Sequence, residues 1–263
     1  MRYEFCARTD RGRVRANNED AVSVDEQRNV AVLADGMGGY NAGEVASSMA
    51  TDFIRTELAR WLAQAGQPTN EGLRRALEIC VQNANKAIFE ASLSHLQYAG
   101  MGTTVVVGVF SGACLLLGHV GDSRCYRLRA GKLEQLTRDH SWLQEQVDAG
   151  LITPQQAAVS SGRNLVTRAL GVEEAVQLEL NEFQVAPGDL FLMCSDGLSE
   201  MVGHADLSAI VASPATLDDK ANHLIAAANA NGGRDNISVL LVQAQPAQRN
   251  QQRGFLARWL GAA

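Results

Sequence analysis

The chain has 263 residues, of which 46% are hydrophobic and 20% charged, with only five prolines. These proportions allow a large buried core and exclude disordered, collagen-like and disulfide-scaffold proteins. The 23 Lys and Arg residues against 29 Asp and Glu residues give a net charge of −6. Because no basic cluster of the kind that binds a phosphate backbone is present, we expect no nucleic-acid partner.

The five cysteines are odd in number, widely spaced and free of any Cys-x-x-Cys pair; they are Cys6, Cys80, Cys114, Cys125 and Cys194. This spacing predicts reduced, buried thiols and neither disulfides nor a zinc site. The amino-terminal residues reach Arg8 and Asp10 without an apolar run long enough for a signal-peptide core. We therefore expect a cytoplasmic location.

The amino-terminal half begins with short extended runs, predicted as strands over residues 3–9, 21–25 and 29–34. Two long helical patterns follow, with apolar stripes over residues 45–62 and 73–91. We expect these two helices to pack against each other.

Residues 101–120 contain no Asp, Glu, Lys or Arg and reach the length of a membrane span. However, β-branched residues over 103–110, the turn signal Ser111-Gly112 and a second apolar run over 113–120 favour a buried hairpin. A further strand is predicted over residues 124–129, ending at the turn Ala130-Gly131.

The segment 139–171 is polar and irregular, with a short helical piece through Trp142, Leu143 and Val147 and a break at Thr153-Pro154. It predicts a surface excursion. The remaining strands are expected at residues 176–185, 189–194 and 237–242, with a helix near 217–229. Strands in blocks, not alternating with single helices, favour mostly antiparallel sheets with helices outside.

Acidic residues stand at the ends of these predicted strands, each beside a glycine or a small polar residue. The pairs are Glu19-Asp20, Asp35-Gly36, Asp122-Ser123, Asp196-Gly197 and Asp235-Asn236. Taken singly, each pair is typical of an ordinary turn. Taken together they are not explained by hairpins, because Asp35-Gly36 leads through Met37-Gly38-Gly39 into a helix and Asp196-Gly197 precedes no matching strand.

Several carboxylates without a thiolate or imidazole cluster are the oxygen ligands that Mg²⁺ and Mn²⁺ prefer. They indicate a two-metal hydrolase that acts on a phosphoryl group. Arg15, four residues before Glu19 and near Arg8, Arg11 and Arg13, supplies a guanidinium that matches a phosphate.

These residues lie in motifs that occur in order along nearly all of residues 8–239. The motifs are Asp10-Arg11-Gly12, Arg15-Ala16-Asn17-Asn18-Glu19-Asp20, Ala34-Asp35-Gly36-Met37-Gly38-Gly39, Gly43-Glu44, Met101-Gly102-Thr103-Thr104, Gly121-Asp122-Ser123-Arg124, Thr167-Arg168-Ala169-Leu170-Gly171, Cys194-Ser195-Asp196-Gly197-Leu198 and Asp235-Asn236-Ile237-Ser238. In this respect the chain resembles the metal-dependent serine/threonine protein phosphatases of the PPM type, also called type 2C, and is most similar to their bacterial branch.

The resemblance implies an α+β fold, a four-layer α-β-β-α sandwich of two mostly antiparallel sheets flanked by helix pairs. It implies two Mn²⁺ or Mg²⁺ ions, with Asp35 bridging them, the Gly36 carbonyl on one, and Asp196 and Asp235 on the other. Asp122 with Asp196 would hold a third, weaker ion. The remaining implied roles are metal-bound waters oriented by Glu19 and Asp20, and substrate phosphate bound by Arg15. Asp35, Asp196 and Arg15 would thus be the catalytic residues.

The chain departs from the family pattern at Met37, where many eukaryotic members have a histidine thought to be the general acid. A methionine donates no proton, so leaving-group protonation is expected from elsewhere. His119 and His140 are the histidines nearest the motifs, and each is more typical of a structural histidine. Segment 139–166 corresponds to the family's variable flap, and its residues 160–164 lack a histidine often seen there.

We expect a catalytic domain over residues 1–243 and, over 244–263, a polar linker with a short amphipathic tail. Phe255, Leu256, Trp259 and Leu260 could give the tail an apolar face for weak docking to a partner or a membrane surface, although a frayed end is the simpler interpretation.

The predicted function is hydrolysis of phosphoserine and phosphothreonine in proteins, reversing a bacterial kinase and involving that kinase and its substrates as partners. Two alternatives stay open, an inactive phosphoprotein-binding scaffold and a regulatory phosphatase dedicated to one signalling protein. The acids at every metal position favour an active enzyme.

Overall fold

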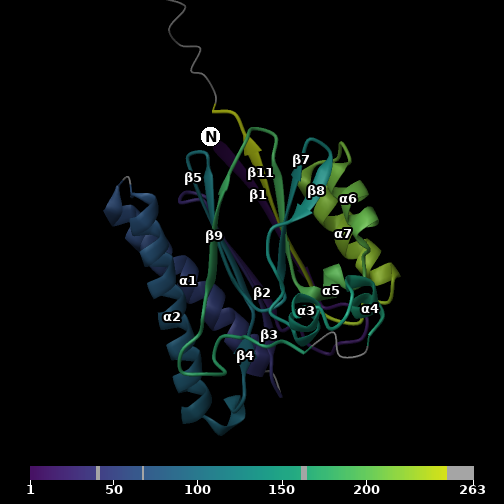
Figure 1. The fold of residues 1–263 in the computed structure, drawn as a ribbon. Helices are drawn as coiled ribbons and strands as arrows, with labels where there is room; N and C mark the ends of the chain where they lie inside the picture. The colour runs from purple at the N-terminus through teal and green to yellow at the C-terminus, as the bar shows by residue number, and fades with distance from the viewer. Residues whose placement is uncertain (40–41, 67, 161–164, 248–263) are drawn as a thin grey trace, which may run out of the picture.

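Two antiparallel β-sheets stack face to face in the computed structural model of the chain, and helices cover the outer face of each sheet (Figure 1). The structure describes residues 1–39, 42–66, 68–160 and 165–247. The sheets, the helix pairs and their four-layer arrangement confirm the predicted α+β sandwich.

The first sheet contains the first and last strands of the domain side by side. Its order is β1 (Arg2–Asp10), β11 (Ile237–Gln245), β10 (Leu190–Cys194), β7 (Arg124–Arg129) and β8 (Lys132–Gln135). The register runs from Arg2 opposite Gln245 to Asp10 opposite Ile237. β11 therefore lies between the amino-terminal strand and β10.

The second sheet is built from the segments that precede and follow the long helices. Its order is β2 (Asp20–Asp25), β3 (Val30–Met37), β5 (Val105–Ser111), β6 (Cys114–Val120) and β9 (Glu179–Gln184), with β4 (Gly102–Thr103) paired to β3. β5 and β6 pair antiparallel through Ser111 opposite Cys114, which confirms the predicted hairpin. None of the helices in the described ranges has the length and hydropathy that a membrane crossing requires.

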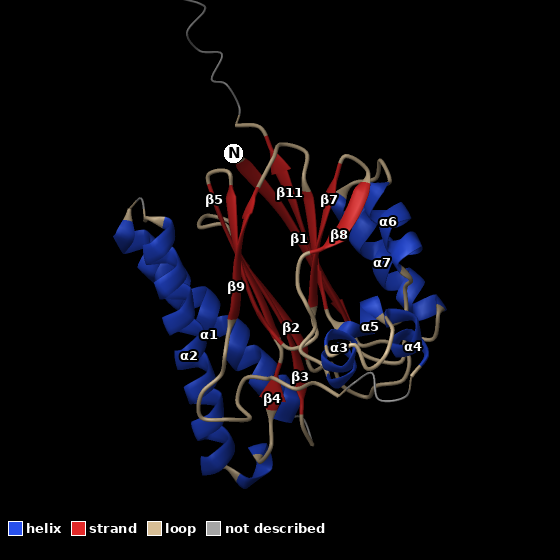
Figure 2. Cartoon of the chain, viewed as in Figure 1, coloured by secondary structure: helices blue, strands red, loops and turns tan. Residues whose placement is uncertain are grey.

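Two pairs of helices cover the sheets (Figure 2). α1 (Ala42–Ala65) and α2 (Asn70–Ser94) pack together on the second sheet, as predicted. The Thr69 side chain caps α2 by accepting a hydrogen bond from the Gly72 N–H. On the first sheet lie α6 (His204–Ala212) and α7 (Leu217–Ala230).

The short helices lie in the connections between these elements. They are η1 (Leu96–Tyr98), α3 (Trp142–Asp148), α4 (Pro154–Val159) and α5 (Asp196–Ser199). α3, α4 and α5 gather at one end of the sandwich, away from the amino terminus (Figure 1).

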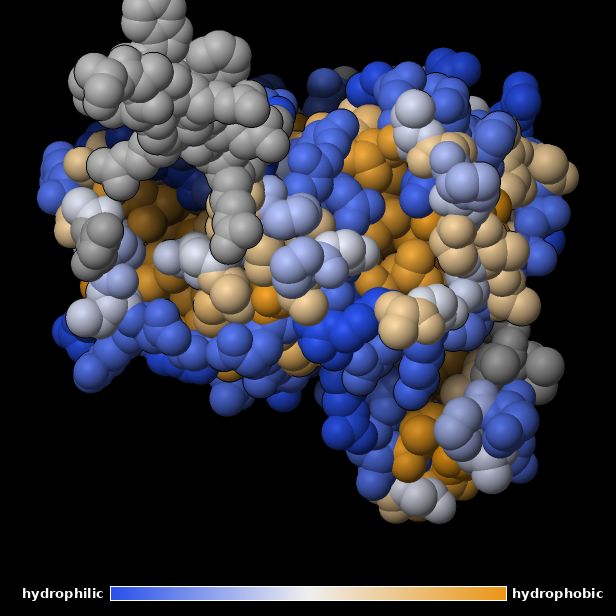
Figure 3. All heavy atoms as spheres, turned by 90° about the horizontal axis from the view of Figure 1, so that it is seen from above, coloured by the Kyte–Doolittle hydropathy of each residue, from blue (hydrophilic) through white to orange (hydrophobic). Residues whose placement is uncertain are grey.

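Strand β3 shows why the apolar runs are continuous. Val30, Val32 and Ala34 face the helices α1 and α2, whereas Ala31 and Leu33 face the other sheet, and all five are fully buried. A strand covered on both faces needs apolar residues at every position. Seen from above, hydrophobic residues emerge between bands of hydrophilic ones at the end of the sandwich near the amino terminus (Figure 3).

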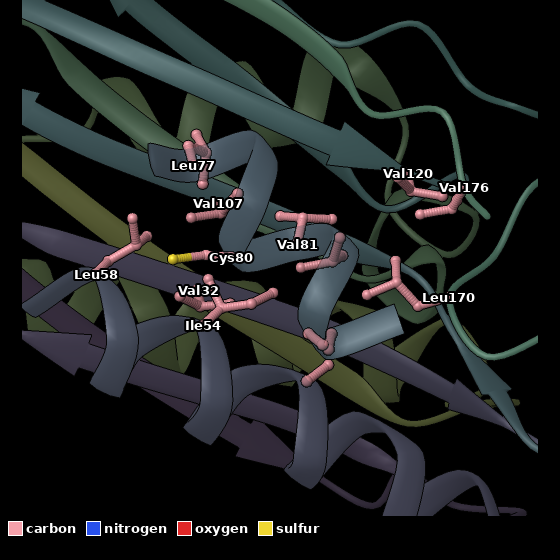
Figure 4. Packing of buried hydrophobic residues seen from close by; sticks show 14 of the residues in the cluster. Val32, Ile54, Leu58, Leu77, Cys80, Val81, Val107, Val120, Leu170 and Val176 are labelled. Atoms are coloured by element: carbon pink, nitrogen blue, oxygen red, sulfur yellow. The ribbon is translucent and has the colours of Figure 1, made fainter. Parts of the chain in front are cut away.

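The layer between the helices and the second sheet is closely packed. Ile54 and Leu58 from α1 meet Leu77 and Val81 from α2 over Val32 of β3 (Figure 4). Burial of each such side chain contributes about 1.5–3 kcal/mol before the entropy of ordering is subtracted. This layer gives the strands a rigid support, so their ends can hold functional groups at fixed positions.

Some local predictions were wrong or incomplete. The break predicted at Thr153-Pro154 lies between α3 and α4, but the prediction missed that α4 begins there, with Thr153 and Gln156 forming a capping box and Pro154 in the first turn. Helix α6 was not predicted. The five cysteines are free, but Cys6 and Cys114 are only partly buried. The predicted tail at 254–260 and the flap residues 161–164 lie outside the described residues.

Candidate active site

The predicted acids come from both sheets and meet at one end of the sandwich. Asp35 lies near the end of β3 and pairs across the strands with Asp20, the first residue of β2. From the other sheet, Asp196 follows β10 as the first residue of α5, and Asp235 stands just before β11. Asp122 lies in the turn between β6 and β7.

These strand ends enclose a cavity of about 220 Å³. It is lined by Arg15, Glu19, Asp35, Gly36, Met37, Gly38, Thr104, Asp122, Val166, Asp196 and Asp235. The structure therefore brings together every predicted site residue except Asp20. That residue is buried beside the cavity, where its Oδ2 accepts a hydrogen bond of 2.7 Å from the Ser195 hydroxyl.

The glycines that follow Asp35 and Asp196 are required by close backbone contacts and not by a hairpin turn. A Cβ at Gly36 would lie 2.1 Å from the carbonyl oxygen of Gly43, and one at Gly197 would lie 2.0 Å from that of Asn236. The Gly36 N–H also donates to the Glu19 carbonyl at 3.0 Å. Any side chain at these two positions would push the acid-bearing segments apart.

The buried carboxylates raise one another's pKa values. Burial, reinforced by the nearby Asp20 and Asp196, raises the pKa of Asp35 well above its usual range. Burial together with Asp122 and Asp235 does the same to the pKa of Asp196. The pKa values of Asp20 and Asp122 are raised to about 6, mainly by burial. Close, desolvated carboxylates of this kind are stabilised by a cation.

One carboxylate oxygen shows directly that this set of donors fits a cation. Asp196 Oδ1 is buried and has no hydrogen-bond partner among the described residues. A buried oxygen left without a partner costs about 1–3 kcal/mol or more when it is charged. Hard divalent cations take ligands of this type, so the residues fit the Mn²⁺ or Mg²⁺ ions that the sequence predicts.

Arg15 is the cation that the cavity itself contains. Its Nη2 donates to Asp235 Oδ2 at 2.6 Å, and about half of the side chain is exposed. This hydrogen bond, opposed by partial burial, raises the pKa of the guanidinium. Arg15 thus faces the acidic cavity and solvent at the same time.

Asn236 was not identified as a site residue from the sequence, where Asp-Asn was interpreted as part of a turn. Its buried side chain accepts from the Glu19 N–H at 2.8 Å and donates to the carbonyls of Arg11 and Asn17, at 3.0 and 2.9 Å. These three bonds hold the loop that carries Arg15 and Glu19. Its position next to Asp235 was the one sequence signal that could have indicated a role in the site, but its hydrogen-bond partners are seen only in the folded structure.

Glu200 was also missed. It lies at the end of α5, four residues after Asp196, and its charge raises the pKa values of Asp196 and Asp122. It lines a second cavity of about 390 Å³, which shares Asp122 and Asp196 with the first. The helical spacing from Asp196 could have indicated this position.

The two histidines are both buried, as structural histidines commonly are, but they form a pair. His119 and His140 stack on each other, with ring centroids 4.7 Å apart, and Glu179 lies beside them. Neither is among the described residues that line the 220 Å³ cavity, whereas Met37 is.

Comparison with known proteins agrees with this geometry. The family model described as Protein phosphatase 2C matches residues 9–237. The chain belongs to the protein phosphatase 2C family. The serine/threonine phosphatase stp of Listeria monocytogenes is 39% identical over 254 residues, covering 95% of this chain and 99% of that protein.

Solved structures of phosphatase 2C relatives share the whole fold. The catalytic domain of the serine/threonine protein phosphatase PstP, in complex with two manganese ions, is 38% identical. Its TM-score is 0.81, and the match covers 93% of this chain and 99% of that one. Stp1 from Staphylococcus aureus is 30% identical with a TM-score of 0.86, covering 94% and 96%.

Proposed function

We propose that the chain dephosphorylates phosphoserine and phosphothreonine in proteins and that the 220 Å³ cavity is where this occurs. The chain is a metal-dependent serine/threonine protein phosphatase of the phosphatase 2C family, as its curated relatives are. The observation that supports the assignment of the site is the convergence of four aspartates, one glutamate and one arginine on a single cavity.

Asp35, the Gly36 carbonyl, Asp196 and Asp235 would hold two Mn²⁺ or Mg²⁺ ions, and Asp122 with Asp196 a third, weaker one. The PstP relative carries two manganese ions on the same fold. When bound, a pair of such cations lowers the pKa of a water molecule and withdraws charge from the phosphoryl oxygens. Glu19 and Asp20 would orient the waters of the site, and Asp20 is itself held by the Ser195 hydroxyl.

Arg15 would bind the substrate phosphate. Its guanidinium lies at the cavity wall and is about half exposed, so it is accessible to a phosphomonoester that enters the cavity. The guanidinium fork matches two phosphate oxygens and orients the ester for in-line attack. Asn236, which holds the Arg15 loop, would act as a positioning residue.

The substrates would be phosphorylated proteins, including those of a cognate Ser/Thr kinase. A regulatory phosphatase dedicated to one signalling protein is the second candidate, and PppA, 31% identical, is described as a regulatory component of a secretion system in Pseudomonas aeruginosa. We also propose a cytoplasmic location, supported by the five free thiols. Residues 1–243 would form the catalytic domain and 244–263 a linker and tail.

The deciding experiment measures hydrolysis of an aryl phosphate and of phosphoserine, phosphothreonine and phosphotyrosine peptides with Mn²⁺, Mg²⁺ or EDTA. We expect activity only with a divalent cation and a preference for the phosphoserine and phosphothreonine peptides. Full activity in EDTA would contradict the two-metal site. Absence of activity with both Mn²⁺ and Mg²⁺ would favour the alternative of an inactive phosphoprotein-binding scaffold.

A further inference from the structure

A buried histidine pair lies beside the turn that carries Asp122. His119, on β6, and His140 stack with their ring planes 13° apart. Both are buried, and His140 Nε2 lies 3.4 Å from Glu179 Oε2 on β9. The proposed mechanism uses none of these three side chains.

The hydrogen bonds assign the protons on both rings. The Gly121 N–H donates to His140 Nδ1 at 3.1 Å, so this nitrogen carries a lone pair, and the neutral ring has its proton on Nε2, toward Glu179. His119 Nε2 lies 2.8 Å from the Arg138 carbonyl and donates to it. Burial, with His119 nearby, lowers the pKa of His140 and favours this neutral form.

The three side chains come close enough to suggest a metal site, with ligand atoms within 4.8 Å of one another. Two observations argue against it. The lone pairs of stacked, nearly parallel rings do not converge on one ion, because a nitrogen binds a metal in its own ring plane. The His140 lone pair, moreover, already accepts from Gly121. The cluster is therefore not suited to hold an ion.

The contacts instead tie two segments together. His140 and Gly121 exchange two hydrogen bonds, since the His140 N–H donates to the Gly121 carbonyl at 2.9 Å while Nδ1 accepts from the Gly121 N–H. The residue before His140, Asp139, receives a two-bond fork from Arg124, with Nε at 2.9 Å and Nη2 at 2.6 Å. Asp122 lies between Gly121 and Arg124, so it is held from both sides.

The turn needs such a restraint. Gly121 has φ +102°, in the region that favours glycine, and a glycine backbone is the least restricted of all. The carboxylate of Asp122 must nevertheless face the wall shared by the two cavities, where it lies with Asp196. Thr104 packs against Gly121 and links the turn to Asp35, whose N–H donates to the Thr104 hydroxyl at 3.0 Å.

We propose that His140, supported by the stacked His119, is a positioning residue that fixes the Gly121-Asp122 turn and thereby sets the affinity of the weakest cation site. This inference rests on the proposed role of Asp122 as a cation ligand. The proposal gives the buried histidine pair a positioning role for the cation site, although neither ring is among the described residues that line the 220 Å³ cavity.

Two substitutions of His140 separate this role from simple packing. His140→Asn keeps an acceptor oxygen at the position of Nδ1, within reach of the Gly121 N–H. His140→Gln places its amide at the position of Nε2 and loses that acceptor. Both remove the stacked ring, so both lose the same packing. Each protein is titrated with Mn²⁺, and the concentration of free Mn²⁺ is measured by electron paramagnetic resonance. Hydrolysis of an aryl phosphate is measured in the same titration.

We expect His140→Gln to lower the affinity of the weakest Mn²⁺ site by at least about 10-fold, as the loss of a residue that supports a metal ligand typically does. His140→Asn should lower the same affinity by less than about threefold. Excess Mn²⁺ should restore part of the activity lost by His140→Gln. Equal weakening in the two variants, or none in His140→Gln, would overturn the proposal.

Two further proteins keep the test decisive if a His140 variant does not fold. Arg124→Lys retains the charge but loses the fork to Asp139, and it should weaken the same Mn²⁺ class; an unchanged class would overturn the proposal. Asp122→Asn should remove that class altogether. If Asp122→Asn leaves all Mn²⁺ binding intact, the cation role of Asp122 fails and the inference fails with it. Activity of the wild type in EDTA would instead contradict the proposed function itself.

Discussion

An aspartate lies near each end of strand β10, and the two differ in their partners and in the direction of their pKa shifts. Asp189 precedes the strand and accepts hydrogen bonds of 2.7 and 2.6 Å from Arg129 and one of 2.8 Å from the Ala186 N–H. Burial alone would raise the pKa of Asp189, but these bonds outweigh it and lower the pKa. Asp196 follows the strand, its buried Oδ1 has no hydrogen-bond partner in the described part of the chain, and burial with the neighbouring acids raises its pKa.

The difference shows how one residue type can be paired within the protein at one end of the sandwich and left without an ion-pair partner among the described residues at the other, where we propose the active site. Asp189 has its counter-charge within the protein, so its ionised form stabilises the fold. Asp196 shares its surroundings with Asp122, Asp235 and Glu200, so its ionised form needs a cation from outside. The direction of the pKa shift therefore distinguishes the two acids. The pKa is lowered for Asp189, whose counter-charge lies within the protein, and raised for Asp196, which is buried among other acids.

The largest expected effect comes from neutralising the unpaired acid. Asp196→Asn should lower hydrolysis of an aryl phosphate by at least about 10²-fold, because it removes a ligand from the electrostatic clamp on the phosphoryl group. Asp35→Asn should act similarly. Asp189→Asn is the matched control and should retain nearly full activity in the same assay. A comparable loss in all three variants would show that the two ends of β10 are not specialised.

The second test reverses the comparison and measures stability. Asp189→Asn should lower the free energy of unfolding by about 2 kcal/mol, less than the loss for a fully buried pair because Arg129 is partly exposed. Asp196→Asn in EDTA should not destabilise the protein, since it removes an uncompensated charge. Urea unfolding of both variants measures this, and a stability loss confined to Asp196→Asn would contradict the comparison.

The stability contribution of Asp189 should also depend on pH in a definite direction. Its pKa in the folded state is lower than the unfolded value of about 3.9, so the contribution is fully present above that value. It is lost as the pH falls through the folded pKa. The difference between wild type and Asp189→Asn should therefore be constant near neutral pH and shrink in acid.

A smaller effect is expected for Arg15→Ala, which removes the guanidinium and leaves the carboxylates in place. The Michaelis constant should rise about 10-fold, as expected for losing a charge-assisted hydrogen bond. Steady-state kinetics at saturating Mn²⁺ measures it. If the Michaelis constant is unchanged while Mn²⁺ binding collapses, Arg15 supports Asp235 and does not bind substrate.

The smallest effect is expected for deletion of residues 254–263. Turnover of an aryl phosphate should not change, while association with a partner or membrane fraction should fall, because four apolar side chains contribute about 1.5–3 kcal/mol each before ordering costs. Sedimentation with vesicles and a thermal melt measure the two properties. A markedly lower melting temperature would show that these residues belong to the core.

The sequence predicted the acids and the strands that carry them because both signals are local. The run Val30–Ala34 is apolar at every position, and Asp35-Gly36 follows it directly. The histidine pair could not be predicted in this way, since His119 and His140 are 21 residues apart in the sequence. They come together only in the fold, where His140 also contacts the turn at Gly121. Asn236 has three partners in a distant loop, which no local pattern encodes.

The pairing of β1 with β11 has a consequence for the newly made chain. Strand β11 lies between β1 and β10, and Asp235 stands two residues before it. A ribosome that has released only the first 230 residues holds a chain whose first sheet lacks the strand between β1 and β10 and whose cavity lacks Asp235. Contacts between such distant segments form late. Phosphatase activity should therefore begin only when synthesis of the domain is nearly complete, and unfinished chains should be unable to act on phosphoproteins.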